Sequence, residues 1–339
     1  MSEDKFTWVE VASDIENIWE ELINQSPQGT IFHTKKFLSA SGVRHRLFLI
    51  KRGREVKAGL TLIESSDGKS LEADDLVIHS GLVFARNDLK KLVKKRFEEF
   101  EIAEMVARWI AENYQNATFC LSPQFEDARA FQWYNYHSLD EKVKYRVDLK
   151  YTSYLGIDEL SEKTCEESDY KLFADMETLR QRHIRAARRE KGRVVRAESA
   201  EALVGFYEAM MLDKDEQQEH DKLERMRNTI DTYVDSNDGA VYNVITDTEE
   251  IVYSVAYLID SKRAYYVFGA GPPEANVKWR GTLAHWEAFL DLSRRLGVRE
   301  IDFEGINSPM RGWFKTGFGG TITPYCEITY PSGLQGQSQ

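Results

Sequence analysis

Residues that could bind an anion gather in the last quarter of the chain, between Arg263 and Tyr330. A strand-like run over Ala264–Phe268 leads into a glycine-rich bend, and a helix with apolar periodicity begins soon after it. Such a bend and a helix N-terminus present unpaired backbone N–H groups, which suit a pyrophosphate; an ordinary loop before a helix is the alternative. The pattern predicts a cofactor site at Gly269, Ala270, Gly271, Arg280, Gly281, Thr282 and Leu283.

Two carboxylates and a lysine follow this expected site. Asp302 and Glu304 are two residues apart around the expected strand Glu300–Phe303, so we expect them to face the same side. Either carboxylate could act as a general base. The alternative for Glu304 is a hydrogen bond to backbone near Gly305. Lys315 precedes a glycine-rich run, which predicts that its ammonium binds a diphosphate.

An arginine with aromatic residues also follows a strand in the first half of the chain. Arg129, Trp133 and Tyr136 together could pair with a phosphate and stack on a pyrimidine. A packed aromatic loop is the alternative. His79 interrupts an expected strand at the position that corresponds to the glycine bend, where it could line a binding site. Its alternative is a buried structural histidine.

The composition narrows the class of protein. The formal net charge of −11 over 339 residues argues against a nucleic-acid partner. The three cysteines, Cys120, Cys165 and Cys326, form no C-x-x-C pair, and no His/Cys/Asp cluster has the spacing of metal ligands. No run is long enough for a membrane span, and no leader is apparent. We therefore expect a cytoplasmic protein without a metal, as a monomer or homodimer.

The order of the expected elements repeats along the chain. In the first half we expect helices and strands over Ile15–Asn24, Phe32–Ser41, Leu47–Lys51, Lys57–Ile63, Leu76–Phe84, Phe97–Asn113, Ala117–Leu121 and Tyr145–Leu149. The second half follows the same order over Ser199–Met211, Ala240–Asp247, Ile251–Ile259, Ala264–Phe268, Leu283–Leu296 and Glu300–Phe303. We therefore predict two α/β domains with mixed sheets, at residues 1–150 and 151–339.

Several segments of the chain resemble a known family in order and type. They are Ser26–His33, Tyr145–Leu149, the helix-like run Leu179–Gly192, Ile301–Gly305 and Phe314–Gly320. Together they resemble the FemAB-like N-acyltransferases, which consist of two tandem GNAT domains, over most of the chain. The resemblance implies an acyl-CoA site in the second domain and an acceptor cleft to which Arg129, Trp133, Tyr136, His79 and Lys315 contribute.

One departure from the family pattern bears on the donor. Family members that build peptidoglycan bridges have a long helical hairpin for aminoacyl-tRNA, whereas Leu179–Lys191 is here a single short helix. The chain looks more like the shorter relatives that acylate a nucleotide-linked amino sugar. We therefore expect transfer from acyl-CoA to such a sugar, for example a dTDP-sugar for surface polysaccharide or lipopolysaccharide synthesis. An aminoacyl-tRNA-dependent transferase and a non-catalytic binding module remain the alternatives.

Overall fold

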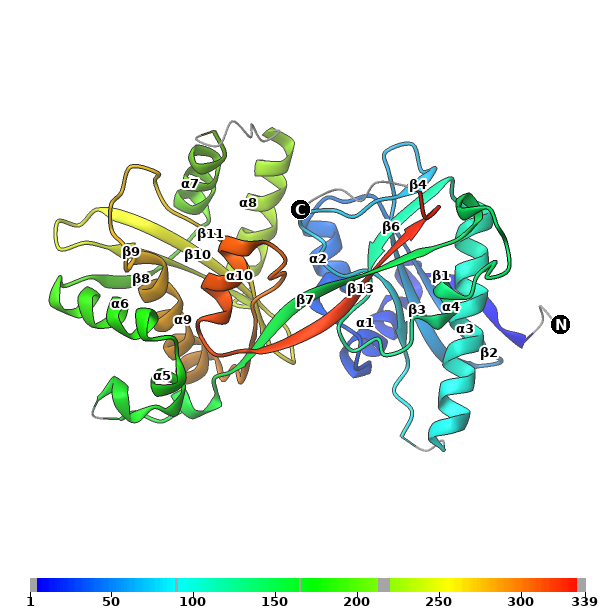
Figure 1. The fold of residues 1–339 in the computed structure, drawn as a ribbon, viewed down its shortest axis with the longest axis horizontal. Coiled ribbons are helices and arrows are strands. Elements are labelled where there is room, and N and C mark those ends of the chain that lie inside the picture. The colour runs from blue at the N-terminus through cyan, green and yellow to red at the C-terminus, as the bar shows by residue number, and fades with distance from the viewer. Residues whose placement is uncertain (1–4, 89–90, 165, 213–219, 334–339) are drawn as a thin grey trace. The chain divides into compact units, whose positions relative to one another are not determined.

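The computed structural model describes residues 5–88, 91–164, 166–212 and 220–333 (Figure 1). Cys165 lies outside these residues; Cys120 and Cys326 are free thiols. The chain forms two compact units. Unit 1 consists of Met1–Tyr151 with Pro324–Gln339, and unit 2 of Thr152–Thr323.

Unit 1 is built around an antiparallel sheet covered by helices. Strands β1, β2, β3 and β5 lie in that order in one sheet, and β6 pairs in parallel with the short β4. The elements in chain order are β1 (Thr7–Glu10), α1 (Glu16–Gln25), α2 (Lys35–Ala40), β2 (His45–Arg52), β3 (Glu55–Ile63), β4 (Ser70–Leu71), β5 (Gly81–Phe84), α3 (Leu92–Asn113), β6 (Asn116–Cys120), α4 (Arg129–Gln132) and β7 (Arg146–Gly156).

Unit 2 follows the same plan. Strands β12, β11, β10, β9 and β8 lie side by side in that order, and α9 packs Leu283, Trp286 and Phe289 into the core of this unit. The elements are α5 (Lys171–Asp175), α6 (Thr178–Arg189), β8 (Arg193–Ala197), α7 (Glu201–Leu212), α8 (His220–Asp235), β9 (Gly239–Ile245), β10 (Ile251–Ile259), β11 (Ala264–Ala270), α9 (Arg280–Leu296), β12 (Glu300–Asp302), α10 (Pro309–Thr316) and β13 (Thr321–Tyr330).

The two units repeat one sequence of elements. In each, a first strand and two helices precede an antiparallel hairpin, a third strand, a long helix, a fourth strand and a short helix. This order runs from β1 to α4 in unit 1 and from β8 to α10 in unit 2, with β4 as an addition to unit 1. The expected mixed α/β repeat is confirmed in its order.

The last strand of each repeat pairs in the other unit. In β7, Tyr154–Gly156 pair with β12 of unit 2, whereas Glu327–Tyr330 of β13 pair with β6 of unit 1. The contacts divide the chain after Tyr151, next to the predicted boundary at residue 150, and they place Pro324–Gln339 with unit 1 and not with the second domain as predicted. Sequence patterns indicate where a strand lies but not which distant strand completes its ladder.

Three element boundaries differ from the sequence prediction. The expected helix Phe32–Ser41 is interrupted at Thr34, because the Thr34 hydroxyl caps α2 by accepting from the Phe37 N–H (3.2 Å). The expected strand Leu76–Phe84 is reduced to β5, since Asp74 holds the preceding residues in a turn. Helix α3 begins at Leu92, five residues before the predicted start. None of the described helices is long and apolar enough to cross a bilayer.

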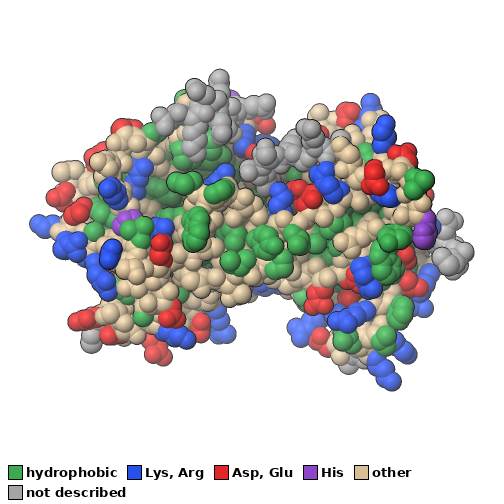
Figure 2. Space-filling view, viewed as in Figure 1, with side chains coloured by type: hydrophobic (Ala, Val, Ile, Leu, Met, Phe, Trp, Pro, Cys, Tyr) green, Lys and Arg blue, Asp and Glu red, His purple; other side chains and the backbone are tan. Residues whose placement is uncertain are grey.

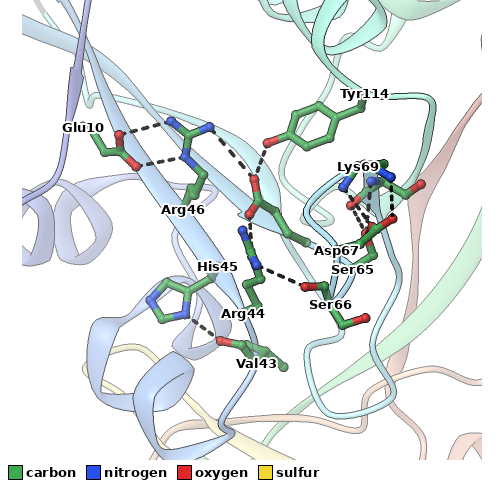
Figure 3. A network of polar contacts seen from close by, with 12 residues as sticks. Glu10, Val43, Arg44, His45, Arg46, Ser65, Ser66, Asp67, Lys69 and Tyr114 are labelled. Carbon is green, nitrogen blue, oxygen red and sulfur yellow. Dashed lines mark hydrogen bonds and ion pairs between the residues drawn. The ribbon is translucent and has the colours of Figure 1, made fainter.

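A buried carboxylate joins the elements of unit 1 (Figure 3). Glu64 has a side chain that is only 4% exposed, and it accepts from Arg44 Nε at 3.0 Å and from the Tyr114 hydroxyl at 2.7 Å. Arg46 lies beside it and forms a forked pair with Glu10 of β1. Because burial makes an unpaired charge costly, these partners fix the hairpin turn that follows β3.

Replacing the buried carboxylate of unit 1 should lower stability more than replacing its exposed neighbour. Glu64→Gln weakens charge-assisted bonds to Arg44 and Tyr114, so we expect it to reduce the free energy of unfolding by roughly 1–3 kcal/mol. Glu10→Gln is the control and should cost less than about 1 kcal/mol, because its ion pair is solvated. Urea denaturation followed by circular dichroism measures both; equal losses would contradict this assignment.

Candidate active site

Strands β11 and β12 separate soon after they meet. Their parallel ladder consists of two residue pairs, Ala264 with Ile301 and Tyr265 with Asp302. Strand β12 ends there, whereas β11 continues to Ala270 along β10, with a bulge at Val267. The second half of β11 therefore lies beyond its parallel ladder, and its backbone polar groups on that edge can accept a ligand that runs alongside.

Gly269 is part of the strand and not the bend that the sequence predicted. It pairs with Val255, and a Cβ at this position would lie 2.6 Å from the hydroxyls of both Tyr253 and Tyr266. The absence of a side chain therefore allows the hydroxyls of two partly buried tyrosines to lie close to Gly269. The bend begins after Ala270, where a Cβ on Gly271 would lie 2.5 Å from the Val252 carbonyl oxygen.

Helix α9 begins at Arg280, close to the predicted start. Arg280 Nη1 donates to the carbonyl oxygens of Pro272 (2.9 Å) and Val252 (3.3 Å), so the side chain ties the preceding loop to β10. Burial lowers the pKa of this guanidinium. Gly281 faces the Phe314 ring, and Leu283 is buried in the core. Arg280 thus shapes the loop that precedes the helix N-terminus.

A buried arginine and a histidine of α6 contact the first turn of α9. The Thr282 hydroxyl accepts from Arg180 Nη1 at 3.3 Å and lies 3.2 Å from His183 Nδ1, both on α6. Arg180 is buried, and its guanidinium lies 4.5 Å from the centre of the Phe314 ring. No acidic residue occupies the first turn of α9. Arginine keeps its charge even when buried, so Arg180 adds a positive charge to that of the helix dipole at this turn. The two together favour binding of an anion.

Glu304 has the most unusual environment of the candidate residues. Its backbone is left-handed (φ 57°), its residue is 4% exposed, and neither carboxyl oxygen has a hydrogen-bond partner within the described parts of the chain. A left-handed non-glycine residue costs roughly 1–2 kcal/mol, and an unbonded buried carboxyl adds to that cost. Such strain at a buried ionisable group indicates a functional position. Because β12 ends at Asp302, Glu304 lies just beyond the strand. The expectation that Glu304 alternates with Asp302 on one strand is wrong.

Asp302 and Lys315 face Glu304. Asp302 Oδ1 accepts from the Thr152 hydroxyl (2.5 Å) and from the Glu304 N–H (2.9 Å). Burial and the charge of Asp302 raise the pKa of the Glu304 carboxyl well above its usual value, and burial also raises the pKa of Asp302. Burial lowers the pKa of Lys315 to about 8. One ammonium group can balance the charge of only one of the two carboxylates. The other carboxyl therefore tends to hold a proton, and Glu304 does so more readily than Asp302, whose charge is stabilised by hydrogen bonds.

Lys315 points inward and donates to the Gly305 carbonyl oxygen at 2.9 Å. It lies on α10, and its position is therefore set by a helix and not by the glycines that follow. Those glycines serve packing: a Cβ on Gly317 would lie 2.9 Å from Arg180 Nε, and one on Gly320 would lie 2.3 Å from Ser153 Oγ. The arrangement favours a role beside Glu304 over the predicted contact with a diphosphate.

His285 is a buried residue of this region that sequence reasoning missed. Its Nδ1 is hydrogen-bonded to the Tyr257 hydroxyl, and its ring packs against Tyr266, Phe303 and Phe318. Burial lowers its pKa to about 3, so the imidazole is neutral at physiological pH. The aromatic spacing of α9 could have marked the face on which it lies. His285 therefore belongs to the aromatic packing beneath Lys315 and the first turns of α9.

The remaining predicted residues belong to unit 1. Arg129 forms a forked pair with Asp127 and lies over the rings of Phe100 and Trp133. Trp133 and Tyr136 are exposed. The Arg129 charge is therefore already neutralised, which does not favour a phosphate contact. His79 is buried, edge-on to Phe32 and Tyr325, as in its structural alternative.

In unit 1 the strands β5 and β6 correspond to β11 and β12, and the side chain of Gln28 lies between their ends. Its Oε1 accepts from the Phe84 N–H and its Nε2 donates to the Gln124 carbonyl oxygen, each at 3.1 Å. The rings of Phe84 and Phe125 stack beside it at 5.5 Å. These side chains use the backbone groups that a ligand at this position would need.

Comparison with known proteins agrees with this geometry. Residues 175–313 match the sequence model of the acetyltransferase (GNAT) domain. These residues include β11, the N-terminus of α9, Asp302 and Glu304. No curated protein sequence matches the chain.

Solved structures show the same fold over nearly the whole chain. FemX has a TM-score of 0.60 at 12% identity, covering 94% of this chain and 96% of its own. A tandem GNAT protein from the clavulanic acid biosynthesis pathway has a TM-score of 0.54 at 12% identity, covering 96% and 97%. The C-terminal domain of a putative lysylphosphatidylglycerol synthetase from Agrobacterium fabrum has 0.54 at 9%, covering 95% and 93%. The protein therefore has a tandem GNAT fold with mixed sheets.

Removing the Glu304 charge should stabilise the protein at neutral and alkaline pH. The folded-state pKa of Glu304 is raised, so its contribution to stability is greatest below the unfolded pKa and is lost as pH rises through the folded pKa. We expect Glu304→Gln to unfold with a free energy about 1 kcal/mol or more above the wild type near pH 8. The two proteins should converge near pH 4. Denaturant titrations across pH measure the difference.

Asp302→Asn is the matched control for this measurement. Asp302 accepts two hydrogen bonds, so its replacement should destabilise the protein at pH 8. A Glu304→Gln protein that is less stable than the wild type at pH 8 would show that the carboxylate is structurally required.

Proposed function

We propose that unit 2 is the catalytic unit of an acyl-CoA-dependent N-acyltransferase. The separation of β11 from β12 beyond Tyr265 carries this proposal. An extended pantetheine arm can hydrogen-bond along the open edge of β11, as an added strand does. Its pyrophosphate would then lie at the N-terminus of α9, near Gly281 and Thr282.

The chemistry needs a proton acceptor close to the thioester. The neutral amine nitrogen attacks the thioester carbonyl carbon and forms a tetrahedral intermediate, whose oxygen is stabilised by a backbone N–H of β11. Glu304 accepts the proton that the amine loses, the carbon–sulfur bond breaks, and the leaving thiolate takes up a proton. A carboxylate with a raised pKa is a stronger base than an exposed one. Lys315 balances the charge of the two carboxyls.

For the acceptor we propose the amino group of a nucleotide-linked amino sugar in the cytoplasm. The resemblance to the shorter FemAB-like enzymes supports this class of acceptor. The tandem GNAT protein from the clavulanic acid pathway was solved in a form without AcCoA, and this link of a similar fold to AcCoA supports a CoA donor. A metal has no part in the proposed reaction.

Aminoacyl transfer from tRNA is a second candidate. Its support is the structural likeness to FemX and to a lysylphosphatidylglycerol synthetase. The single helix α6 and the net charge of −11 favour CoA instead. Retention of tRNA on the protein, with steep salt dependence and no thermal stabilisation by CoA, would favour the second candidate.

The pH dependence of acyl transfer should reveal Glu304. Because a base must be ionised, we expect kcat/KM to fall as pH decreases through a pKa above the usual value of a glutamate. Glu304→Gln should remove this limb and lower kcat by roughly 100-fold or more. Product formation from an acyl-CoA and a panel of dTDP- and UDP-amino sugars, followed by mass spectrometry, measures both. An unchanged profile in Glu304→Gln would exclude this residue as the base.

The loop before α9 should determine donor affinity. Arg280→Ala removes the contacts to Pro272 and Val252, and we expect Kd for CoA to rise roughly tenfold, as for one lost charged hydrogen bond. Arg295→Ala, at the other end of α9 and paired with Asp291, is the control and should bind CoA normally. Isothermal titration calorimetry measures both. Equal affinities in the two variants would contradict the donor site.

A further inference from the structure

The first part of α3 extends beyond the core of unit 1. The buried residues of α3 are Ile102, Ala103, Val106, Ala107 and Ile110, all from its eleventh residue onward. The preceding residues, from Leu92 to Glu101, include no buried side chain. Figure 1 shows this end of α3 reaching past the strands of its own unit. This segment is thus free to meet a partner without disturbing the core.

Large apolar side chains occupy this projecting end. Leu92 is 59% exposed, Val93 57% and Phe97 68%. Val93 and Phe97 are four residues apart and share one face of the helix, and Phe100 continues it. Such a concentration of exposed apolar side chains on one helix end indicates a binding surface.

The neighbouring segment extends this face with aromatic rings. Trp133 packs edge-on against Phe100, with ring centres 5.5 Å apart, and remains half exposed. Tyr136 is exposed as well. We call the set Leu92, Val93, Phe97, Phe100, Trp133 and Tyr136 the α3 face.

Basic residues surround the apolar ones at this end. Lys91 is the N-cap residue of α3, Lys94, Lys95 and Arg96 lie in its first two turns, and its first turn has no acidic residue. Cations at a helix N-terminus oppose the helix dipole, so this charge does not serve the helix. Of the acids that follow, Glu98 pairs with Arg52 and Lys57, Glu99 with Lys95, and Glu101 with Lys5. Figure 2 shows Lys and Arg together with hydrophobic side chains at the end of α3.

We propose that the α3 face binds the negatively charged surface of a lipid bilayer. The pattern is that of an interfacial helix, in which apolar and aromatic side chains enter the headgroup region while Lys and Arg attract anionic lipids. The four cations between Lys91 and Arg96 contrast with the net charge of −11 of the chain, which gives the surface a defined orientation toward such a membrane. Tryptophan and tyrosine at its rim are the residues that prefer the bilayer interface.

The aliphatic residues distinguish this partner from a nucleic acid. Leu92 and Val93 are the most N-terminal members of the face and have no ring for base stacking, whereas both can enter the acyl-chain boundary. A second copy of the chain would present the same cations to each other across a symmetric contact, which is unfavourable. The bilayer is therefore the partner that satisfies both the apolar and the basic residues.

Vesicle flotation tests this proposal with the full chain. We expect the protein to float with vesicles of phosphatidylcholine and phosphatidylglycerol, and binding to fall at least tenfold with pure phosphatidylcholine or in 0.5 M salt, because ionic attraction is screened. Val93→Glu/Phe97→Glu should lose binding, and Lys94→Glu/Arg96→Glu should lose the anionic selectivity. Leu149→Glu changes an exposed leucine of unit 1 outside this face and should float like the wild type.

Several outcomes would overturn the proposal. The first is that the wild type does not float with the vesicles, and the second is that Val93→Glu/Phe97→Glu floats as well as the wild type. The third is that the wild type binds no vesicles and the variant instead loses a dimer contact or tRNA binding. Circular dichroism should show an unchanged Tm for the variant, since both side chains are exposed. Its acyl transfer to a soluble acceptor should also be unchanged, so failure of membrane binding leaves the proposed reaction untouched.

Discussion

The place where the β11–β12 ladder ends governs the whole candidate site. Two residue pairs hold the strands together, and the next residues of β11 then pair only with β10. The bulge at Val267 and the close approach of two tyrosines to Gly269 keep β11 on its course. Because β12 ends at Asp302, the chain turns there and places Glu304 beside the same opening. The separation that exposes backbone groups for a donor also positions the ionisable groups.

Glu304 shows how the fold tolerates an unfavourable residue. Its left-handed backbone, burial and missing hydrogen bonds all oppose stability, and an Asn or Gly would fit the backbone better. The charge of Lys315 and the hydrogen bonds of Asp302 offset part of this cost. His285 and its aromatic neighbours pack beneath these residues. At the equivalent junction of unit 1, Gln28 joins the strand ends with ordinary amide hydrogen bonds.

The sequence predicts the elements of this protein well and their partners poorly. Apolar periodicity located α9 and the hairpin β9–β10 within a few residues, since both depend on local patterns. The start of α9 was also predicted to within a few residues. The sequence assigned Lys315 to a diphosphate, and its position near Asp302 and Glu304 was not predicted. The left-handed turn at Glu304 was not, because glutamate carries no signal for it. Helix α10 was missed because its eight residues include Pro309 and Gly312. The exchange of β7 and β13 depends on contacts between distant segments, which one sequence does not reveal.

That exchange has a consequence for how the protein forms on the ribosome. Strand β13 is synthesised after every other described strand, yet it pairs with β6, which is made long before it. During synthesis, β6 of unit 1 therefore lacks this neighbouring strand until β13 has left the exit tunnel. Exposed strand edges invite wrong pairing. Nascent chains of this protein should thus depend on chaperones that shield early strands, and pauses late in translation should affect the N-terminal unit more than the C-terminal one.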